Sequence, residues 1–435
     1  MAHSNPALRI LLVGGRILPY RHAGDKNYWL DVIRELTTRG HHVTVLSVTL
    51  ETVPEPTEYA CEYIRPVPVH LRAMDQTAEE YRFNEEYGWL RGTNNYASKT
   101  LSLWRIARSI RRHLHDARPD VVHFCSNFGP AMALLRPFAG EVPLSISAPT
   151  YNGGPVLYDT ALWASFLGFD TVVPYSDAFA RRLRALGVAE ERLRTIRWGV
   201  DMDRFRPPTP EARESARREL GLQENEKVVF WAGFLQQMTS ADFRFAVRAA
   251  ELVLRAGFTG WRFFFCMKPE HYDPRFRRFE RPGLTVGGTA QLFHRVQLAA
   301  DVMLSPIADL RSTAAPPLTW IESMALGIPI ITTGLPGADE VVRDGLNGFL
   351  IRSPEEAAQL FGELVRSPER LIRARPEARR RVEERFALST SVTEYVDLWT
   401  AMAGLGPNPS PVGAGNGSTA QAAPPPPLRP LRSLM

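Results

Sequence analysis

The start of one predicted helix, in the second half of the chain, carries the residues best suited to chemistry. Pro316–Pro317 ends a loop and opens a helical pattern that contains Glu322. Proline fits the first turn of a helix, and the N–H groups that follow it, those of Leu318 and Thr319, are free to donate hydrogen bonds. Because these groups stand at the positive end of the helix, they form a site for an anion such as a phosphate. Glu322 lies one turn further in, so the segment offers both anion-binding donors and a carboxylate.

Small and polar residues near the N-terminus form a second candidate site. Gly15 ends the first predicted strand, and its missing side chain would let a ligand approach the backbone closely. Gly14 and Gly15 do not complete a G-x-G-x-x-G pattern, so this turn gives little support for NAD binding. Gly24 opens the next helix beside Asp25 and Lys26. These two side chains could contact a polar ligand or simply begin the helix, and the sequence favours neither role.

Cysteines and paired aspartates give no support for a metal site. Cys61, Cys125 and Cys266 are too far apart for a zinc site, and an odd number does not favour a disulfide framework. This use of cysteine is typical of a reducing compartment, so we expect a cytoplasmic protein. Cys125 fits a packed thiol better than a nucleophile, because the sequence places no base near it. Asp201 and Asp203 spell a metal-binding Asp-x-Asp pair inside a turn, where we expect a structural role and no metal.

Short apolar runs alternate with helical patterns along most of the chain, as parallel α/β sheets require. Strands at 9–15 and 42–48, with the helix 26–39 between them, form a βαβ unit. Further strands are predicted at 120–125, 143–148, 170–176, 227–234, 261–267, 284–288, 301–306 and 328–334. The strands divide into two doubly wound, Rossmann-like halves facing across a cleft, with ligands at the carboxyl ends of the strands.

A change in composition marks the expected domain limits. The Pro-rich stretch 204–211 separates the two halves. We expect an N-terminal domain at 1–200, a C-terminal domain at 201–387, and a helix at 388–404 that packs back on the N-terminal domain. From 405 to 435 the chain is rich in Pro, Gly and Ala without apolar periodicity, so we expect a disordered tail.

The overall composition excludes several classes of protein. Of 435 residues, 44% are hydrophobic and 23% are charged, which is a globular mixture rather than that of a collagen-like, coiled-coil or wholly disordered chain. A net charge of +5 is too small for a dedicated nucleic-acid binder. The apolar run near the N-terminus has only about five residues, too few for a signal peptide or a membrane-spanning helix.

One segment, 99–115, has a basic amphipathic pattern. It carries five Lys and Arg residues and an apolar stripe at helical spacing. Such a helix either docks on an anionic membrane, at the inner face in a cytoplasmic protein, or covers the sheet and turns its arginines to water. The second interpretation is the favoured one.

Three segments resemble, in the same order, motifs of the family-4 retaining glycosyltransferases with the GT-B fold. They are the N-terminal glycine turn with its helix and Arg39-Gly40-His41, the segment 172–207 with a Ser-initiated helix and a Gly-Val-Asp run, and the segment 300–348. The resemblance covers about 10–403. It implies a first domain that holds the acceptor and a second domain that holds a nucleoside-diphosphate sugar.

The resemblance also assigns roles to individual residues. It implies that Glu322 faces the donor sugar or ribose. The other residues expected on the donor side are Gly233, Pro317, Leu318, Thr319 and Glu340, the last in a turn, GLPGADEVV, that should open another helix. The residues expected on the acceptor side are Gly15, Gly24, Asp25, Lys26 and Cys125.

Several donor-site positions depart from the family pattern. The family has two glutamates eight residues apart, and Ala314 stands where the first would be. The family often has a second histidine two residues after the one matching His123, where this chain has Cys125. It also has an Arg and a Lys after the first strand of the second domain, whereas the stretch 233–243 contains neither. Lys268 and Arg311 are candidates to replace these cations, although both could be ordinary surface charges.

These observations predict an enzyme of carbohydrate biosynthesis. It would transfer a hexosyl group from a nucleoside-diphosphate sugar to an acceptor hydroxyl, with retention of configuration and without a metal or other cofactor. The acceptor could be a saccharide, a lipid-linked molecule or a small natural product. Two alternatives remain: a catalytically weak GT-B protein that activates another glycosyltransferase, and a nucleotide-sugar epimerase.

Overall fold

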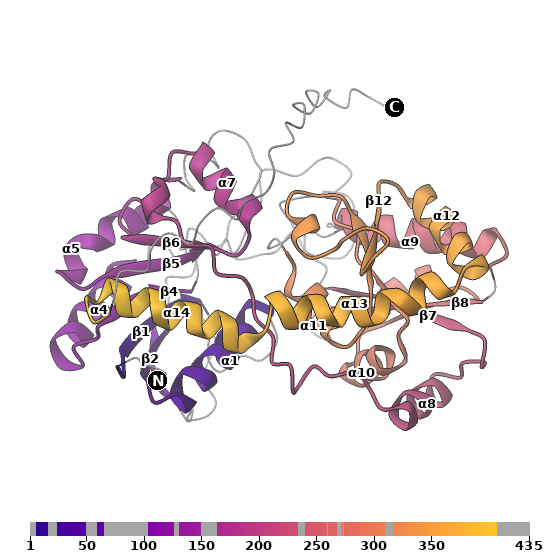
Figure 1. The fold of residues 1–435 in the computed structure, drawn as a ribbon, viewed down its shortest axis with the longest axis horizontal. Helices are drawn as coiled ribbons and strands as arrows, with labels where there is room; N and C mark the ends of the chain where they lie inside the picture. Colours follow the sequence, from indigo (N-terminus) through magenta and orange to yellow (C-terminus); the bar gives the residue numbers. More distant parts are fainter. Residues whose placement is uncertain are drawn as a thin grey trace.

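Two parallel sheets of six strands each form the two halves of the molecule (Figure 1). The computed structural model describes residues 6–15, 24–48, 59–64, 103–125, 130–148, 163–233, 240–258, 260–267, 272, 274–308 and 316–406. The predicted tail, 405–435, lies almost wholly outside these residues. The predicted fold class, two Rossmann-like sheets, is confirmed.

The first sheet has the strand order β3-β2-β1-β4-β5-β6. Its strands are β1 (Arg9–Gly15), β2 (His42–Val48), β3 (Ala60–Ile64), β4 (Val121–Phe124), β5 (Leu144–Ala148) and β6 (Thr171–Pro174). Its helical segments are α1 (Gly24–Thr38), α4 (Leu103–Asp116), η1 (Pro130–Leu135), α5 (Arg136–Ala139), α7 (Asp177–Ala185) and η2 (Glu190–Arg192). We call this half the first unit.

The second sheet repeats the same winding, in the order β12-β11-β10-β7-β8-β9. Its strands are β7 (Lys227–Gly233), β8 (Trp261–Met267), β9 (Leu284–Gly287), β10 (Val302–Leu304), β11 (Ile330–Thr333) and β12 (Gly348–Ile351). Its helical segments are α8 (Pro210–Glu219), α9 (Ser240–Arg255), η4 (Pro274–Phe279), α10 (Ala290–Ala299), α11 (Leu318–Ala325), η6 (Ala338–Glu340), α12 (Pro354–Arg366) and α13 (Glu369–Arg385). We call this half the second unit.

The two strands absent from the sequence prediction, β3 and β12, are both edge strands: β3 is the third strand of the first winding, and β12 is the sixth strand of the second. Each is short, and β3 is only partly buried along most of its length. An edge strand pairs on one side only, so it needs no long apolar run of the kind that marks the central strands. The ten predicted strands all exist, with ends shifted by at most a few residues.

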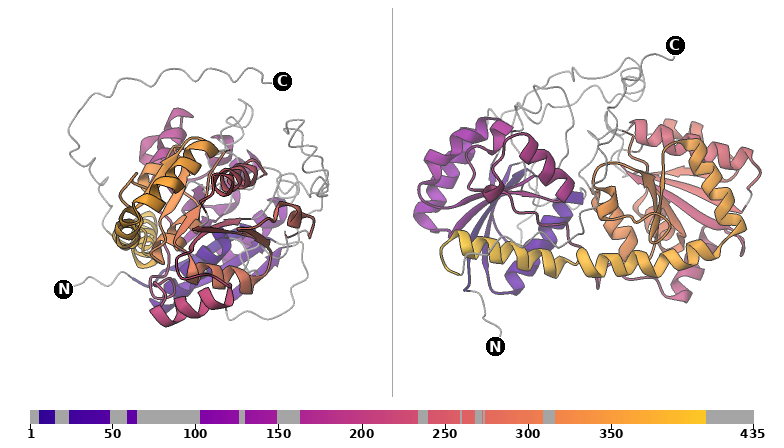
Figure 2. Two further views of the ribbon diagram at one scale, coloured as in Figure 1. Left: turned by 90° about the vertical axis from the view of Figure 1, so that its right-hand side faces the viewer. Right: turned by 45° about the horizontal axis from the view of Figure 1, so that its top comes forward.

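The last helix of the described chain, α14 (Leu388–Met402), returns to the first unit. The views in Figure 2 show α13 and α14 following one another along one side of both units. The chain therefore crosses twice between the units, at Val200 and at Ala387, and the two crossings are joined by a parallel bridge. Gly199 permits this approach, since a Cβ there would lie 2.6 Å from the Cα of Leu388.

Candidate functional site

Each sheet has one place where the direction of winding reverses, and these two places define the candidate site. In the first sheet β1 and β4 are neighbours, and in the second sheet β7 and β10 are neighbours. In open α/β sheets, ligands bind outside the carboxyl ends of the strands at this reversal point. We call the carboxyl ends of β1 and β4 the first edge, and those of β7 and β10 the second edge. Gly15 and Cys125 lie at the first edge, and Gly233 and Ser305 lie at the second.

At the second edge, the strand ends are tied to the first turn of α11. The indole N–H of Trp320 donates a 2.8 Å hydrogen bond to Ser305 Oγ, and the hydroxyl of Thr332 donates one of 2.8 Å to the Ser305 carbonyl. All three side chains are buried. Buried polar groups that are fully paired rigidify the elements they join. The start of α11 is therefore fixed relative to β10 and β11.

Two further contacts hold the loop that leaves β10. The Thr333 hydroxyl donates to the Ile307 carbonyl at 2.7 Å and accepts from the Ile307 N–H at 3.0 Å. The Ala308 N–H donates to the buried carboxylate of Asp242, at the start of α9, with a distance of 2.5 Å. Sequence reasoning missed Asp242, although its place in the first turn of a helix that follows a strand end is a recognisable signal.

The predicted helix start is found where the sequence placed it. Pro317 is the N-cap of α11, and the first hydrogen bond of the helix runs from the Trp320 N–H to the Pro317 carbonyl at 3.1 Å. The N–H groups of Leu318 and Thr319 thus precede the helical hydrogen-bond ladder and point toward its N-terminal end. Glu322 is partly exposed in the second turn. Donor-binding roles for these residues stay predictions.

Gly233, at the carboxyl end of β7, has a packing role that the structure makes explicit. A Cβ at this position would lie 2.7 Å from the indole ring of Trp231, so only glycine fits there without movement. The two candidate cations, Lys268 and Arg311, lie outside the described residues. Their contact with a diphosphate remains a prediction.

Glu340 lies where the sequence predicted a further helix, but the structure has only the short turn η6. The buried side chains of Val341 and Val342 and a tight turn at Gly345, with φ of 72°, redirect the chain into β12. The prediction of a helix here was wrong. Both carboxylate oxygens of Glu340 accept hydrogen bonds from backbone N–H groups of α7, in the other unit.

At the first edge, Cys125 follows β4 and its N–H donates to the Val13 carbonyl at 2.8 Å. The Cys125 side chain is only 2% exposed and belongs to the apolar core. Gly24, Asp25 and Lys26 begin α1, and their side chains lie outside the described part of the structure. Contacts of these residues with an acceptor stay predictions.

Beneath the first edge, His123 is the centre of a buried polar network. Its ring nitrogens lie 2.8 Å from Ser145 Oγ and 3.0 Å from Ser147 Oγ. Tyr395 and Trp399 of α14 bind the same two serines, at 2.8 Å and 3.2 Å. Complete burial lowers the pKa of His123 to about 3, so the ring is neutral at physiological pH. The histidine holds α14 on the sheet.

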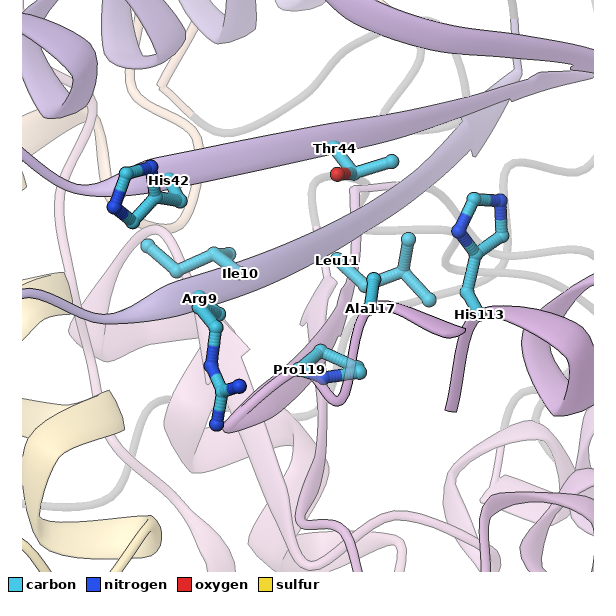
Figure 3. A pocket seen from close by; sticks show the side chains of 8 residues that line it. All are labelled: Arg9, Ile10, Leu11, His42, Thr44, His113, Ala117 and Pro119. Carbon is cyan, nitrogen blue, oxygen red and sulfur yellow. The ribbon is translucent and has the colours of Figure 1, made fainter. Parts of the chain in front are cut away.

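A cavity of about 130 Å³ opens at the opposite edge of the first sheet (Figure 3). Arg9 and His42, which line it, begin β1 and β2, and His113 lies near the end of α4. These are the amino ends of the strands, away from the edge where α/β sheets bind ligands. We therefore do not assign the cavity to the candidate site.

The Asp-x-Asp pair and the cysteines show no arrangement for metal binding within the described residues. Asp201 Oδ1 accepts hydrogen bonds from the N–H groups of Asp203 and Arg204, at 2.9 Å and 3.1 Å, and so closes a local turn. No cluster of three His, Cys, Asp or Glu side chains suited to a metal occurs in the described ranges. No helix in those ranges is both long and apolar enough to span a membrane.

Comparison with known families identifies both halves of the chain. Residues 24–204 match the family described as Glycosyltransferase Family 4, and residues 226–367 match that described as Glycosyl transferases group 1. A D-inositol 3-phosphate glycosyltransferase of Nocardia farcinica is 29% identical over 224 residues, which are 47% of this chain and 47% of the relative. The chain spans about half the length of the first curated relatives that it matches.

Solved structures agree on the fold. A glycosyltransferase from Rickettsia africae superposes with a TM-score of 0.68 at 15% identity, covering 91% of this chain and 98% of that one. Anabaena Alr3699/HepE, solved in complex with UDP-glucose, gives a TM-score of 0.64 at 14% identity and covers 91% and 100% of the two chains.

Proposed function

Since the chain belongs to the family-4 and group-1 glycosyltransferases with the GT-B fold, we propose that it transfers a hexosyl group from a nucleoside-diphosphate sugar to an acceptor hydroxyl. The observation that carries this proposal is the edge of the second sheet, where α11 begins. Its first N–H groups are oriented by the bonds of Trp320 and Thr332 to Ser305, and Glu322 follows one turn later. Preorganised N–H groups stabilise the charge that develops on a leaving diphosphate.

The nucleotide class of the donor is supported by a structural neighbour. Anabaena Alr3699/HepE, which has the same fold, has been solved with UDP-glucose. The direct test offers the purified chain a panel of labelled sugar nucleotides, with and without candidate acceptors, and measures nucleotide release and sugar transfer. Transfer to an acceptor supports the proposal, whereas nucleotide binding without any transfer contradicts it.

Retention of configuration and independence of metal complete the proposed reaction. Both follow from the family resemblance, which the segment 300–348 carries most clearly. The product anomer, determined by NMR, tests retention. Activity that survives treatment with a chelator supports the absence of a metal requirement, and loss of activity that Mg²⁺ restores contradicts it.

The missing Arg and Lys after Gly233 require another source of positive charge. Half an elementary charge at a helix end does not neutralise a diphosphate, so a cationic side chain should reach it as well. We assign this role to Lys268 or Arg311. Replacing the responsible residue with Ala should weaken UDP binding by about tenfold, the size of one lost charge-assisted hydrogen bond, and leave uridine binding unchanged. Equal UDP affinity in both variants would contradict the assignment.

The acceptor domain has a feature that favours a membrane-bound acceptor. The helix α4 buries Leu103, Ile106 and Ile110 against the sheet, as the favoured interpretation of this segment required. Its outer face nevertheless carries Trp104, which is 59% exposed, in line with the exposed Arg108 and Arg111 at helical spacing. An exposed tryptophan among arginines fits an anionic lipid surface better than water alone.

Peripheral contact through residues 99–115 is therefore part of the proposal. Sedimentation with phosphatidylcholine vesicles, with and without phosphatidylglycerol, measures it. The wild type should bind the anionic vesicles, and Trp104→Ala together with Arg108→Glu should abolish binding. Arg218→Glu, at an exposed arginine on α8, makes the same reversal of charge away from residues 99–115 and should leave binding unchanged.

Two alternatives give different results in the same assays. A nucleotide-sugar epimerase would change the sugar without an acceptor. A catalytically weak partner protein would release no nucleotide alone but would raise the rate of another glycosyltransferase. The replaced positions Ala314 and Cys125 motivate the second alternative.

A further inference from the structure

Glu340 of the second unit occupies the N-terminus of α7 in the first unit. Its Oε2 accepts a 2.9 Å hydrogen bond from the Asp177 N–H, and its Oε1 accepts one of 2.7 Å from the Ala178 N–H. The next N–H, that of Phe179, donates to the N-cap Ser176. The free donors of the first turn of α7 are thus shared between a local cap and a carboxylate that lies more than 160 residues away in sequence.

Positive groups surround the carboxylate of Glu340. The positive end of a helix attracts a negative group, and hydrogen bonds to a charged acceptor are the strong ones. Arg197 lies 3.5 Å from Glu340 Oε2 and pairs with Asp177 on the helix itself. Arg381 of α13 donates to the Glu340 carbonyl at 2.5 Å, which orients the turn. The Glu340 side chain is only 12% exposed.

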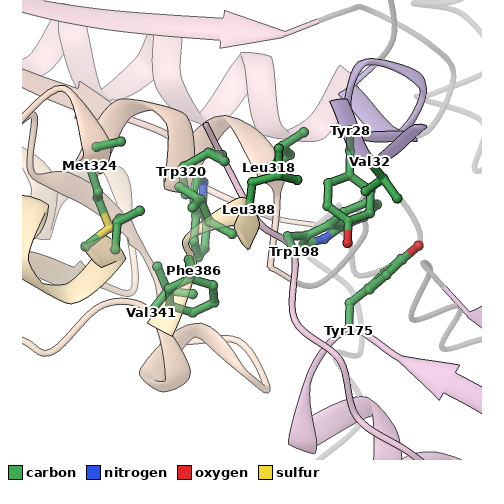
Figure 4. Close-up of a cluster of buried hydrophobic side chains, with 14 of the residues drawn as sticks. Tyr28, Val32, Tyr175, Trp198, Leu318, Trp320, Met324, Val341, Phe386 and Leu388 are labelled. Carbon is green, nitrogen blue, oxygen red and sulfur yellow. The ribbon is translucent and has the colours of Figure 1, made fainter. Parts of the chain in front are cut away.

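The backbone next to Glu340 is shaped for the same contact. Gly337 has φ of 87°, and a Cβ on it would lie 3.2 Å from the Cβ of Ala178. Only a residue without a side chain lets the turn approach α7 so closely. Around the contact, apolar side chains of both units form one continuous core, in which Tyr28 and Trp198 of the first unit lie beside Leu318 and Leu388 (Figure 4).

The turn that carries Glu340 is also connected to the candidate donor edge. Thr333, the last residue of β11, binds both backbone groups of Ile307. The chain runs from Thr333 through Gly337 to Glu340 in a single short turn, with the Leu335 N–H donating to the Thr333 carbonyl at 2.9 Å. A movement of the donor edge relative to the first unit would therefore pull Glu340 away from α7.

We propose that Glu340 is a positioning residue that latches the two units together by binding the start of α7, and that this contact sets the arrangement of the units for transfer. Only the effect of this contact on transfer rests on the proposed function. The positioning role differs from the donor-binding role expected from the sequence, because both carboxylate oxygens of Glu340 already accept hydrogen bonds from α7.

The test compares Glu340→Gln with a matched control, Glu363→Gln. The first substitution keeps the size of the side chain but removes its charge and one of its two acceptor oxygens. Glu363 of α12 forms an ion pair with Arg370 of α13, so its substitution makes the same change of charge away from the interface. Hydrogen exchange at 177–178 measures the contact, small-angle X-ray scattering measures the separation of the units, and UDP titration with steady-state kinetics measures function.

The latch predicts four results for Glu340→Gln. Exchange at 177–178 rises by about tenfold, the radius of gyration increases, kcat falls by about tenfold, and UDP affinity stays within about twofold of the wild type, on the scale of one charged hydrogen bond. The control Glu363→Gln changes none of these. If Glu340→Gln does not fold, Glu340→Asp, whose shorter side chain can keep only one of the two bonds, should show smaller changes in the same direction.

Two outcomes overturn the latch. One is an unchanged radius of gyration and kcat after the exchange data show that the contact is lost. The other is a UDP or sugar-nucleotide affinity that falls in proportion to kcat, which would make Glu340 a donor ligand. A chain that transfers no sugar but still opens in Glu340→Gln would refute the proposed function and leave the latch standing.

Discussion

Each unit fixes one covering helix to its sheet through buried hydroxyl groups, but the two helices come from very different distances along the chain. In each sheet, buried hydroxyl groups on or beside the central strands bind aromatic side chains of a covering helix. In the second unit, Ser305 binds Trp320 of α11, fifteen residues away. In the first unit, Ser145 and Ser147 bind Trp399 and Tyr395 of α14, about 250 residues away.

In one unit the anchored helix is part of the candidate site, and in the other unit it is not. The helix anchored in the second unit is the one whose N-terminus forms the candidate anion site, so the anchor and the site are made by one local segment. The helix anchored in the first unit contributes no candidate site residue and packs against the sheet and α1. We therefore expect changes in the second network to affect chemistry, and changes in the first network to affect stability.

The largest effect is expected at Glu322. Glu322→Gln keeps the shape of the side chain and should reduce turnover by roughly 10- to 1000-fold, the range for one charged hydrogen bond lost in the transition state. Circular dichroism should show an unchanged fold. Unchanged kinetics would remove Glu322 from the site, and loss of folding would make it a structural residue.

The first network should make stability depend on pH through His123. Its pKa is about 3 in the folded chain and about 6.5 when unfolded, so between these values the unfolded state binds more protons. The contribution of His123 to the free energy of unfolding should therefore fall by roughly 1.4 kcal/mol for each pH unit between 6.5 and about 3. In His123→Asn this component is absent, which urea unfolding at pH 6.5 and pH 5 would reveal. His42→Gln, at an exposed position, is the control and should retain the wild-type dependence.

The second network is tested by Trp320→Phe. The change removes the indole N–H and leaves the buried Ser305 hydroxyl without that donor, at a cost of about 1–2 kcal/mol in the free energy of unfolding. UDP affinity should fall as well, because the start of α11 loses its anchor. Trp104→Phe is the matched control at an exposed site and should stay within about 0.5 kcal/mol. Equal destabilisation in both variants would contradict the comparison.

The smallest effect is expected at Cys125, on the first edge. Cys125→Ala should cost about 1 kcal/mol of stability through lost apolar contact and leave turnover within about twofold. Cys266→Ala, in the core of the second unit, should behave alike, since burial raises the pKa of that thiol to about 12 and makes it unreactive. A hundredfold loss of turnover in Cys125→Ala alone would show that this thiol takes part in the reaction.

The sequence predicted the elements whose positions depend on local patterns of residues. Central strands such as 9–15 and 261–267 have long apolar runs, and the start of α11 is marked by Pro317, so their positions were confirmed. The edge strands β3 and β12 were missed because both are short and β3 is only partly buried, whereas the other two edge strands, β6 and β9, were predicted. The turn GLPGADEVV was expected to open a helix, but the buried Val341 and Val342 and the turn at Gly345 redirect the chain into β12.

The contacts between segments far apart in the chain were not predicted from the sequence. The hydrogen bond of Glu340 to α7 joins residues more than 160 positions apart. No local pattern around either residue indicates that the two are in contact. The same holds for His123, whose neighbours on α14 were predicted only as a helix that packs back. Single-sequence reasoning therefore placed the candidate site on its elements but did not reveal how the two units are held together.

The return of α14 to the first unit also dictates the order in which the molecule can be completed. The strands of the first sheet end at Pro174, yet the aromatic side chains that cover His123 and its serines come from residues 395 and 399. At roughly 5–20 residues per second, a growing chain would leave that face open for roughly 10–45 seconds while the second unit is made. During this interval the half that emerges first from the ribosome lacks the aromatic cover of that buried network, and the network is complete only when residues 395 and 399 have been added.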